Sequence, residues 1–205
     1  MSGSLKVGGS ELINDNGGSG ALQWGTGLPS GSIIQVHSTQ LTTSVSTTSI
    51  NGSVDTVVSN GTASTTGSSI LDVNITPKIT GSKIWLQCSW VGEFAFASNA
   101  YNHMFFFWRN TTKLANTTSS TGTNQVGISP ATLTYWSSDD DTTLEHLFKQ
   151  YFDTHGISAG TQITYKLGLI VKHGDTLYTN RTVGEGSSDD HERGVSSLVA
   201  IELAP

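Results

Sequence analysis

The alternation of apolar and polar residues is clearest between residues 160 and 183. If the run TQITYKLGLIVK is extended, one of its sides carries Ile163, Tyr165, Leu167, Leu169 and Val171. A period of two with one apolar side is typical of a half-buried β-strand. The next run, TLYTNRTV, is rich in residues that fit a pleated sheet. We therefore expect a hairpin with its tip at residues 173–175, which needs further strands to bury its apolar face.

Runs with the same period lie earlier and later in the chain. Residues 70–77 alternate, and the run SKIWLQCSW gathers its apolar residues on one face. Residues 104–108 are apolar on both faces, as expected for a strand in the middle of a packed sandwich. The inward-facing positions expected from these runs and from the first and last strands are Ile33, Ile34, Ile84, Leu86, Cys88, Trp90, Val195, Leu198, Ala200 and Leu203.

Two stretches give less direct patterns. Residues 39–69 form a Ser/Thr/Gly/Asn tract, for which we expect one or two surface strands rather than one long structureless loop. Residues 142–152 place Leu144, Leu147 and Phe148 at helical spacing after an acidic start, so periodicity alone predicts a helix there. The rest of the chain contains roughly eight to ten short strands at regular intervals, which indicates an all-β antiparallel sandwich or a jelly-roll-like domain.

The first 28 residues differ from the rest. Short apolar groups alternate with glycine-rich turns, and the segment is too small to have a core of its own. A purely flexible linker would lack these apolar residues. We therefore expect residues 1–28 to be an attachment arm, followed by a sandwich domain at residues 29–205. The residues through which the arm would bind another protein are Leu12, Ile13, Leu22 and Trp24.

Composition narrows the class of protein. Charged residues make up 13% of the chain, compared with ~25% in ordinary soluble domains. A net charge of -6 with 10 Lys and Arg argues against binding to nucleic acid. No apolar run approaches the ~20 residues of a membrane span, and the N-terminus lacks the apolar core of a signal peptide. The single cysteine has no partner for an intramolecular disulfide, so we expect synthesis in a cytoplasm and stability from packing or oligomerisation.

Candidate chemistry is sparse. The chain has no nucleophile elbow, P-loop, dinucleotide fingerprint or H-E-x-x-H motif, so we do not expect an enzyme. Acidic loops supply the oxygen ligands that Ca²⁺ prefers, but without EF-hand spacing, so Ca²⁺ is an alternative to the expected lack of a cofactor. An aromatic face beside carboxylates suits a glycan, although core packing is the alternative for Trp136. The candidate glycan-binding residues are Tyr135, Trp136, Asp139, Asp140, Asp175, Asp189 and His191.

The order of the strand sequences resembles a known family. LDVNITPKITGSKIWLQCSW, FFFWRN, YFDTHGISAGTQITYKLGL, TLYTNRTV and SSLVAIEL follow one another as in the knob domains of tailed-bacteriophage virion appendages. The similarity is to short tail fibre or spike proteins of phages from aquatic hosts, including cyanophages, and covers residues 27–203. His155 stands where a proline is expected. The matching positions are Ile75-Thr76-Pro77, Tyr151-Phe152-Asp153, Thr164-Tyr165 and Asn180-Arg181.

The resemblance implies a β-sandwich knob that assembles as a homotrimer. It also implies that residues 147–152 form a strand, and we follow it over the helical spacing. The expected function is then that of a virion protein, made in the host cytoplasm, whose arm binds other virion proteins and whose knob contacts host surface polysaccharide. The alternatives are a capsid decoration or cement protein and a polysaccharide-degrading tailspike.

Overall fold

The structure is a computed structural model. It describes residues 4–14, 23–24, 27–50, 56–57, 61–62, 69, 71–95, 103–114, 129–130, 143–171, 175–184 and 191–205. Every regular element in these ranges is a β-strand, and all the strand pairs are antiparallel except β5–β7. This confirms the all-β antiparallel fold class expected from the sequence.

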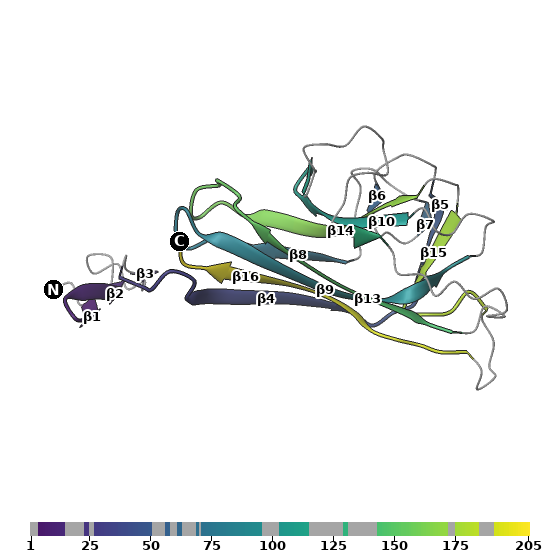
Figure 1. Cartoon of the computed structure of the whole chain (residues 1–205), viewed down its shortest axis with the longest axis horizontal. Coiled ribbons are helices and arrows are strands. Elements are labelled where there is room, and N and C mark those ends of the chain that lie inside the picture. The colour runs from purple at the N-terminus through teal and green to yellow at the C-terminus, as the bar shows by residue number, and fades with distance from the viewer. Residues whose placement is uncertain are drawn as a thin grey trace.

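Two sheets face each other across one hydrophobic core (Figure 1). The seven-stranded sheet, called the β9 sheet below, contains β4 (Ile33–Leu41), β16 (Ser196–Leu203), β9 (Lys83–Phe94), β13 (Glu145–Asp153), β15 (Asp175–Thr179), β5 (Val45–Ile50) and β7 (Gly61–Thr62). The six-stranded sheet, called the β14 sheet, contains β8 (Asp72–Ile75), β14 (Ile163–Val171), β10 (His103–Arg109), β11 (Thr112–Lys113), β6 (Thr56–Val57) and β12 (Ser129–Pro130). The sandwich expected from the sequence is therefore present.

Strands that are distant in sequence are neighbours in both sheets. β9 lies between β16, where Cys88 aligns with Leu198, and β13, where Cys88 aligns with Lys149. β14 likewise pairs with β10 and with β8. These long-range pairings join the early and late parts of residues 29–205 into one sandwich, while the jelly-roll assignment and the trimer stay predictions.

The alternating residues of β9 and β14 fill the core as predicted. Their buried side chains are Ile84, Leu86, Cys88, Trp90, Ile163, Tyr165, Leu167 and Leu169. Burying a large apolar side chain stabilises the fold by about 1.5–3 kcal/mol. Burial also raises the pKa of the Cys88 thiol to about 12, so this cysteine is an unreactive core residue.

The hairpin predicted within residues 160–183 is wrong. β14 pairs with β10, β8 and β6 in one sheet, whereas β15 pairs with β9 and β5 in the other. The chain therefore passes from one sheet to the other between Val171 and Asp175. Alternation identified both strands correctly, but a period of two does not specify which strand lies alongside.

The helix indicated by the spacing of residues 142–152 is also wrong, and the strand implied by the resemblance is present as β13. On β13, Leu147 and Asp153 are buried, whereas Phe148 and Phe152 are exposed. Apolar residues on both faces of one strand produced the helix-like spacing.

Two residues expected to face inward are exposed. Ile34 is buried, but a register shift between β16 and β4 places Ile33 opposite Leu203 and leaves it exposed. Val195 precedes the first residue of β16 and is exposed as well, whereas Leu198 and Ala200 are buried as expected. The prediction for Leu203 is also wrong, because Leu203 aligns with the outward Lys83 and is half-buried on the outer face. The register shift explains Ile33. Val195 and Leu203 each lie three residues from Leu198 or Ala200, so a period of two places them on the other side of the strand.

Residues 4–24 contribute a separate three-stranded antiparallel sheet of β1 (Ser4–Val7), β2 (Ser10–Asn14) and β3 (Gln23–Trp24). Gly8 and Gly9, with φ of 58° and 85°, make the turn between β1 and β2, a conformation that favours glycine. The chain then reaches the sandwich at Gly31, whose N–H donates to the Ala204 carbonyl at 3.0 Å. Figure 1 shows this arm beyond the end of the sandwich that holds the C-terminus, with β5, β7 and β15 toward the opposite end.

Candidate interaction surfaces

An apolar row crosses the outer face of the β9 sheet. Strand register aligns Val36 on β4 with Ile201 on β16, Ile201 with Trp85 on β9, and Trp85 with Phe152 on β13. The strand neighbours of Trp85 and Ile201 are buried between the sheets, so these two side chains point to the opposite face, and the register places Val36 and Phe152 on that same face. We call these four residues the apolar row.

The row is covered at its centre and open at its ends. Trp85 and Phe152 are stacked, with ring centroids 5.3 Å apart and an interplanar angle of 9°. Ile201 is 8% exposed, whereas Val36 and Phe152 are 55% and 54% exposed. Stacking contributes about 0.5–1.5 kcal/mol beyond area burial but leaves much of the Phe152 ring in water. The accessible apolar surface therefore lies on the two outermost strands.

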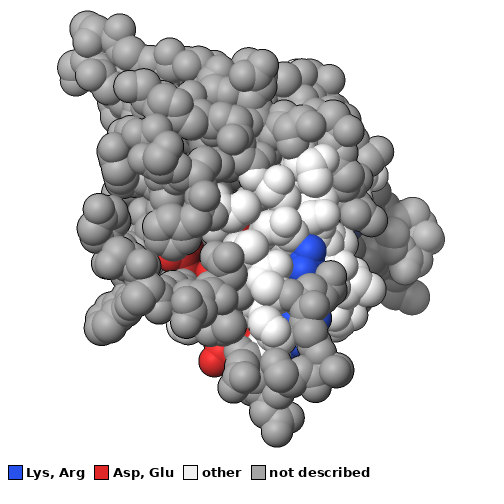
Figure 2. Space-filling view, turned by 90° about the vertical axis from the view of Figure 1, so that its right-hand side faces the viewer, with Lys and Arg blue, Asp and Glu red and all other residues white. Residues whose placement is uncertain are grey.

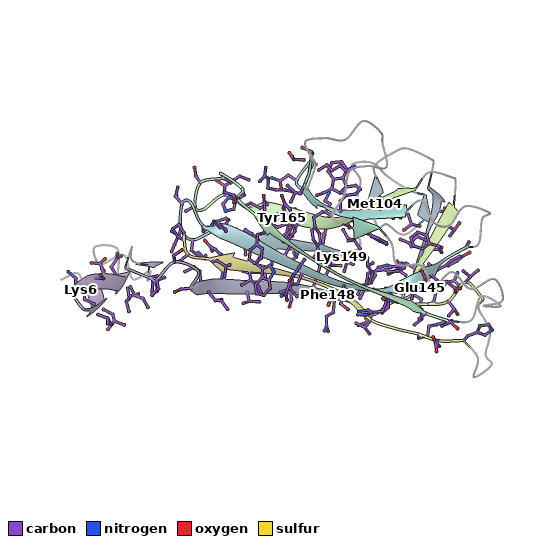
Figure 3. The ribbon with its side chains drawn as sticks, viewed as in Figure 1. Lys6, Met104, Glu145, Phe148, Lys149 and Tyr165 are labelled. Atoms are coloured by element: carbon purple, nitrogen blue, oxygen red, sulfur yellow. The ribbon has the colours of Figure 1, made fainter. Side chains whose placement is uncertain are left out.

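Both outermost strands carry a second exposed apolar residue. Ile33 joins Val36 on β4, and Phe148 joins Phe152 on β13. Figure 3 shows Phe148 on the side of β13 away from the β14 sheet, whereas Tyr165 lies toward the space between the sheets. Among the described strands, β4 pairs with β16 alone and β13 with β9 alone, so each is an edge of the sheet. We call Ile33 and Val36 the β4 edge, and Phe148 and Phe152 the β13 edge.

This outer face carries little charge. Most outward positions of the four strands hold apolar, hydroxyl or amide side chains. The exceptions are Lys83, His146 and Glu93, of which Glu93 is buried. The others are Ile33, Val36, Ser38, Gln40, Trp85, Gln87, Ser89, Val91, Phe148, Gln150, Phe152, Ser197, Val199, Ile201 and Leu203. Protein interfaces are depleted of charge and enriched in aromatic residues at their centres. The face therefore has the composition of a protein contact surface.

The outer face of the β14 sheet differs from that of the β9 sheet, because its large aromatic residues are covered. There Phe106 and Trp108 pack edge to face, with centroids 5.5 Å apart, and are only 1% and 9% exposed. The Lys113 ammonium lies 4.4 Å from the centre of the Phe106 ring. The large aromatic residues on this face are thus buried within the single chain, unlike those of the β13 edge.

A buried polar contact fixes β13 in place. Arg109 Nη1 on β10 donates to both carboxylate oxygens of Asp153 at 2.9 and 3.1 Å, and the Tyr165 hydroxyl on β14 donates to the same carboxylate at 2.7 Å. Burial, followed by the negative charge of Asp153, raises the pKa of Tyr165 well above its usual range, so the phenol stays protonated as a donor. Asp153 therefore ties the end of β13, beside Phe152, to the other sheet.

Glu202 fixes the neighbouring end of β16. Its buried carboxylate accepts hydrogen bonds from Gln35 Nε2 at 2.6 Å and from the backbone N–H groups of Lys78 and Ile79. A carboxylate with several donors is strongly held. The hydrogen bond to Gln35 holds β4 at the residue next to Val36 of the β4 edge.

The arm also has an apolar row. Register aligns Leu5 on β1 with Ile13 on β2, and Ile13 with Trp24 on β3. Leu5 is exposed and Ile13 is half-buried, as is Leu12. The side chain of Trp24 and all of Leu22 lie outside the described residues. The exposed Leu5 and the half-buried Leu12 and Ile13 make a sheet this small suited to binding another surface.

Most of the predicted glycan-binding residues lie outside the described part of the chain, namely Tyr135, Trp136, Asp139, Asp140 and Asp189. Asp175 begins β15 and His191 is half-buried, but nothing described joins them into one site. Figure 2 views the end of the sandwich opposite the arm, where the described surface is mostly uncharged with a few acidic and basic side chains. The candidate glycan site therefore stays a prediction.

No group of three or more His, Cys, Asp or Glu side chains suited to a metal ion occurs among the described residues, so Ca²⁺ stays an untested alternative. Among these residues there is also no helix with the length and apolar character needed to cross a membrane.

Sequence reasoning missed the β4 and β13 edges. A usable signal was present in β9, where Trp85 stands between the core residues Ile84 and Leu86 and must therefore point outward. A large aromatic residue at an outward position indicates that either another part of the same chain or a partner covers it.

Comparison with known proteins does not identify the family of this chain, because no protein-family model and no curated protein matches it significantly.

Proposed function

We propose that the chain is a structural protein of a bacteriophage virion, a homotrimeric appendage of the tail fibre or spike type without catalytic activity. Its arm anchors it to other virion proteins, and its sandwich contacts polysaccharide on the host surface. The observation that carries the proposal is the position of the arm, a small separate sheet with exposed Leu5 and Val7 at one end of the sandwich.

This polarity suits an attachment protein. The arm and the C-terminus share one end, so a partner bound to the arm leaves the end with β5, β7 and β15 directed away from it. A trimer presents three weak sites together, which raises avidity without new contacts. The order of the strand sequences along the chain resembles that of phage knob domains, which supports the same proposal.

Location on the particle tests the proposal. Immunogold labelling of purified phage particles with antibodies against residues 29–205 should place the label at the tail. Label spread over the shell would instead support the alternative of a capsid decoration protein. Particles that carry no label, although the antibody recognises the isolated protein, would overturn both.

A further inference from the structure

The exposed large apolar residues of the sandwich are grouped rather than scattered. Outside the arm, those among the described residues are Ile33, Val36, Phe148, Phe152 and Val195. Four of the five form the β4 edge and the β13 edge, two on each. Single apolar residues on a surface need no partner, but grouped apolar residues on a face with little charge are typical of an interface.

The β4 edge and the β13 edge lie at two different edge strands of the β9 sheet, and their side chains share its outer face. Three strand spacings separate Val36 from Phe152, a distance of about 14 Å. Between them Ile201 is already buried, so a partner gains little at the centre of the row and most at its ends. A partner that covers both ends must therefore either span the sheet or approach from two sides.

We propose that copies of the chain meet edge to edge, with the β13 edge of one copy packed on the β4 edge of the next. This inference rests on the proposed trimer and names its contact surface. Because the two edges are different surfaces, the contact is heterologous, and three copies close into a ring in which every edge is covered. Such closure buries all four exposed residues in every copy.

A second copy fits these edges better than an acidic glycan or a membrane surface. Polyanions and anionic headgroups are recognised by clustered Lys and Arg, and Lys83 is the one such residue at the outward positions of these four strands. The complementary surface, apolar and uncharged, is provided by the opposite edge of the same sheet. Self-association also explains why only the β14 sheet has its outer aromatic residues buried within one chain.

The test is the solution mass of edge variants, measured by size-exclusion chromatography with light scattering. The native chain should have three times its mass of 21.7 kDa. Phe152→Lys and Val36→Glu should each lower that mass threefold, to the monomer, with an unchanged circular dichroism spectrum. Thr112→Lys, which adds the same charge at an exposed position on β11, is the control and should stay trimeric.

The double variant Phe152→Lys, Val36→Glu separates edge-to-edge packing from other arrangements. Opposite charges then meet between copies and should restore the trimer, whereas within one copy they are too far apart to pair. Monomeric single variants without rescue would overturn the pairing of the two edges. Single variants that stay trimeric would overturn this contact surface but leave the trimer standing, and a monomeric native chain would overturn both.

Discussion

Tyr165 and Asp153 connect the two sheets of the sandwich through a 2.7 Å hydrogen bond from the phenol to the carboxylate. Asp153 belongs to β13 and Tyr165 to β14, and Arg109 on β10 completes the contact with a 2.9 Å ion pair. The carboxylate is nearly buried, so each donor offsets part of the cost of removing the charge from water.

Tyr165→Phe removes one of these donors and keeps the ring. It should lower the free energy of unfolding by about 1–3 kcal/mol, because a buried carboxylate loses a partner. Urea denaturation followed by tryptophan fluorescence gives this value. The control is Tyr178→Phe, which keeps the ring beneath the Arg181 guanidinium and should change stability by less than about 0.5 kcal/mol. Equal effects of the two variants would contradict the assigned role of the phenol.

His155 should make the sandwich less stable in mild acid. Its pKa is lowered from the ordinary 6.5, mainly by burial and also by the Arg109 guanidinium, against the opposing effects of the Asp153 and Glu202 carboxylates. Its Nδ1 accepts the Ile157 N–H at 2.9 Å, which requires the unprotonated nitrogen. Because the folded pKa is below the unfolded one, stability is fully present above pH 6.5 and declines as pH falls toward the folded pKa.

The matched variant is His155→Asn, whose side-chain oxygen can accept the same N–H but does not titrate in this range. Urea denaturation between pH 8 and pH 5 should show a steeper loss of stability below pH 6.5 for the native chain than for the variant. Parallel curves for the two proteins would show that His155 is not the group responsible.

Gly168 on β14 lies directly beneath the Phe106 ring. A Cβ at Gly168 would be 2.4 Å from Cε2 of that ring, too close for both to remain in place. Gly168→Ala should therefore cost about 1–3 kcal/mol of stability. Phe106→Ala in the same chain removes the obstacle, so a double-mutant cycle should show the two changes to be strongly non-additive.

Gly92 provides the contrast. A Cβ there would be 2.1 Å from the Tyr178 carbonyl oxygen, which is backbone and has no other position to take. Gly92→Ala should be more destabilising than Gly168→Ala, and no side-chain truncation should rescue it. If Gly92→Ala proves as mild as an ordinary surface change, the close approach of β9 and β15 is wrong.

The structure explains the asparagine of the Asn180-Arg181 pair. Its φ of 64° lies in the left-handed region, where asparagine is tolerated better than most residues. Its Nδ2 donates to the carbonyls of Leu41 and Thr43 at 2.6 and 3.0 Å, and its Oδ1 accepts from Ser196 Oγ at 2.7 Å. Both β16 and the segment after β4 are thus held by one side chain.

Two substitutions at Asn180 separate backbone from side chain. Asn180→Gly keeps the left-handed conformation and loses the hydrogen bonds, whereas Asn180→Asp turns a carboxylate oxygen toward two carbonyl oxygens. The aspartate variant should be less stable than the glycine variant by about 1–3 kcal/mol at pH 7, as measured by chemical denaturation. The reverse order would show that the side-chain donors contribute little.

Local pattern was sufficient to predict the fold class but not the neighbours of each strand. β9 and β14 were identified because each places large residues at every second position. The pairing of β15 with β9 rather than β14 depends on the whole sheet, as does the register that aligns Phe152 with Trp85. Asp153 likewise finds Arg109 and Tyr165 only after both sheets have formed, so the sequence shows three polar residues without their connection.

The candidate site was less predictable than the fold for a related reason. The arm was predicted from isolated apolar residues between glycine turns, and strands are present there. The residues of the β4 edge are at least 112 positions from those of the β13 edge, the nearest two being Val36 and Phe148. No local window contains both, and only the assembled sheet brings them to one face.

Deleting residues 2–28 should separate anchoring from folding. The contacts that close the sandwich at this end, from Gly31 N–H to the Ala204 carbonyl and from Ala204 N–H to the Ser32 carbonyl, lie outside the deletion. The shortened chain should therefore keep its unfolding temperature and its oligomeric state but fail to enter phage particles, as measured by immunoblotting of purified virions. Leu5→Asp in the full chain, which places a charge on the exposed apolar row of the arm, should weaken incorporation in the same direction, while Ser4→Asp on the same strand serves as the control. Normal incorporation of the shortened chain would contradict the anchoring role of the arm, and an unfolded product would show instead that β1, β2 and β3 support the sandwich.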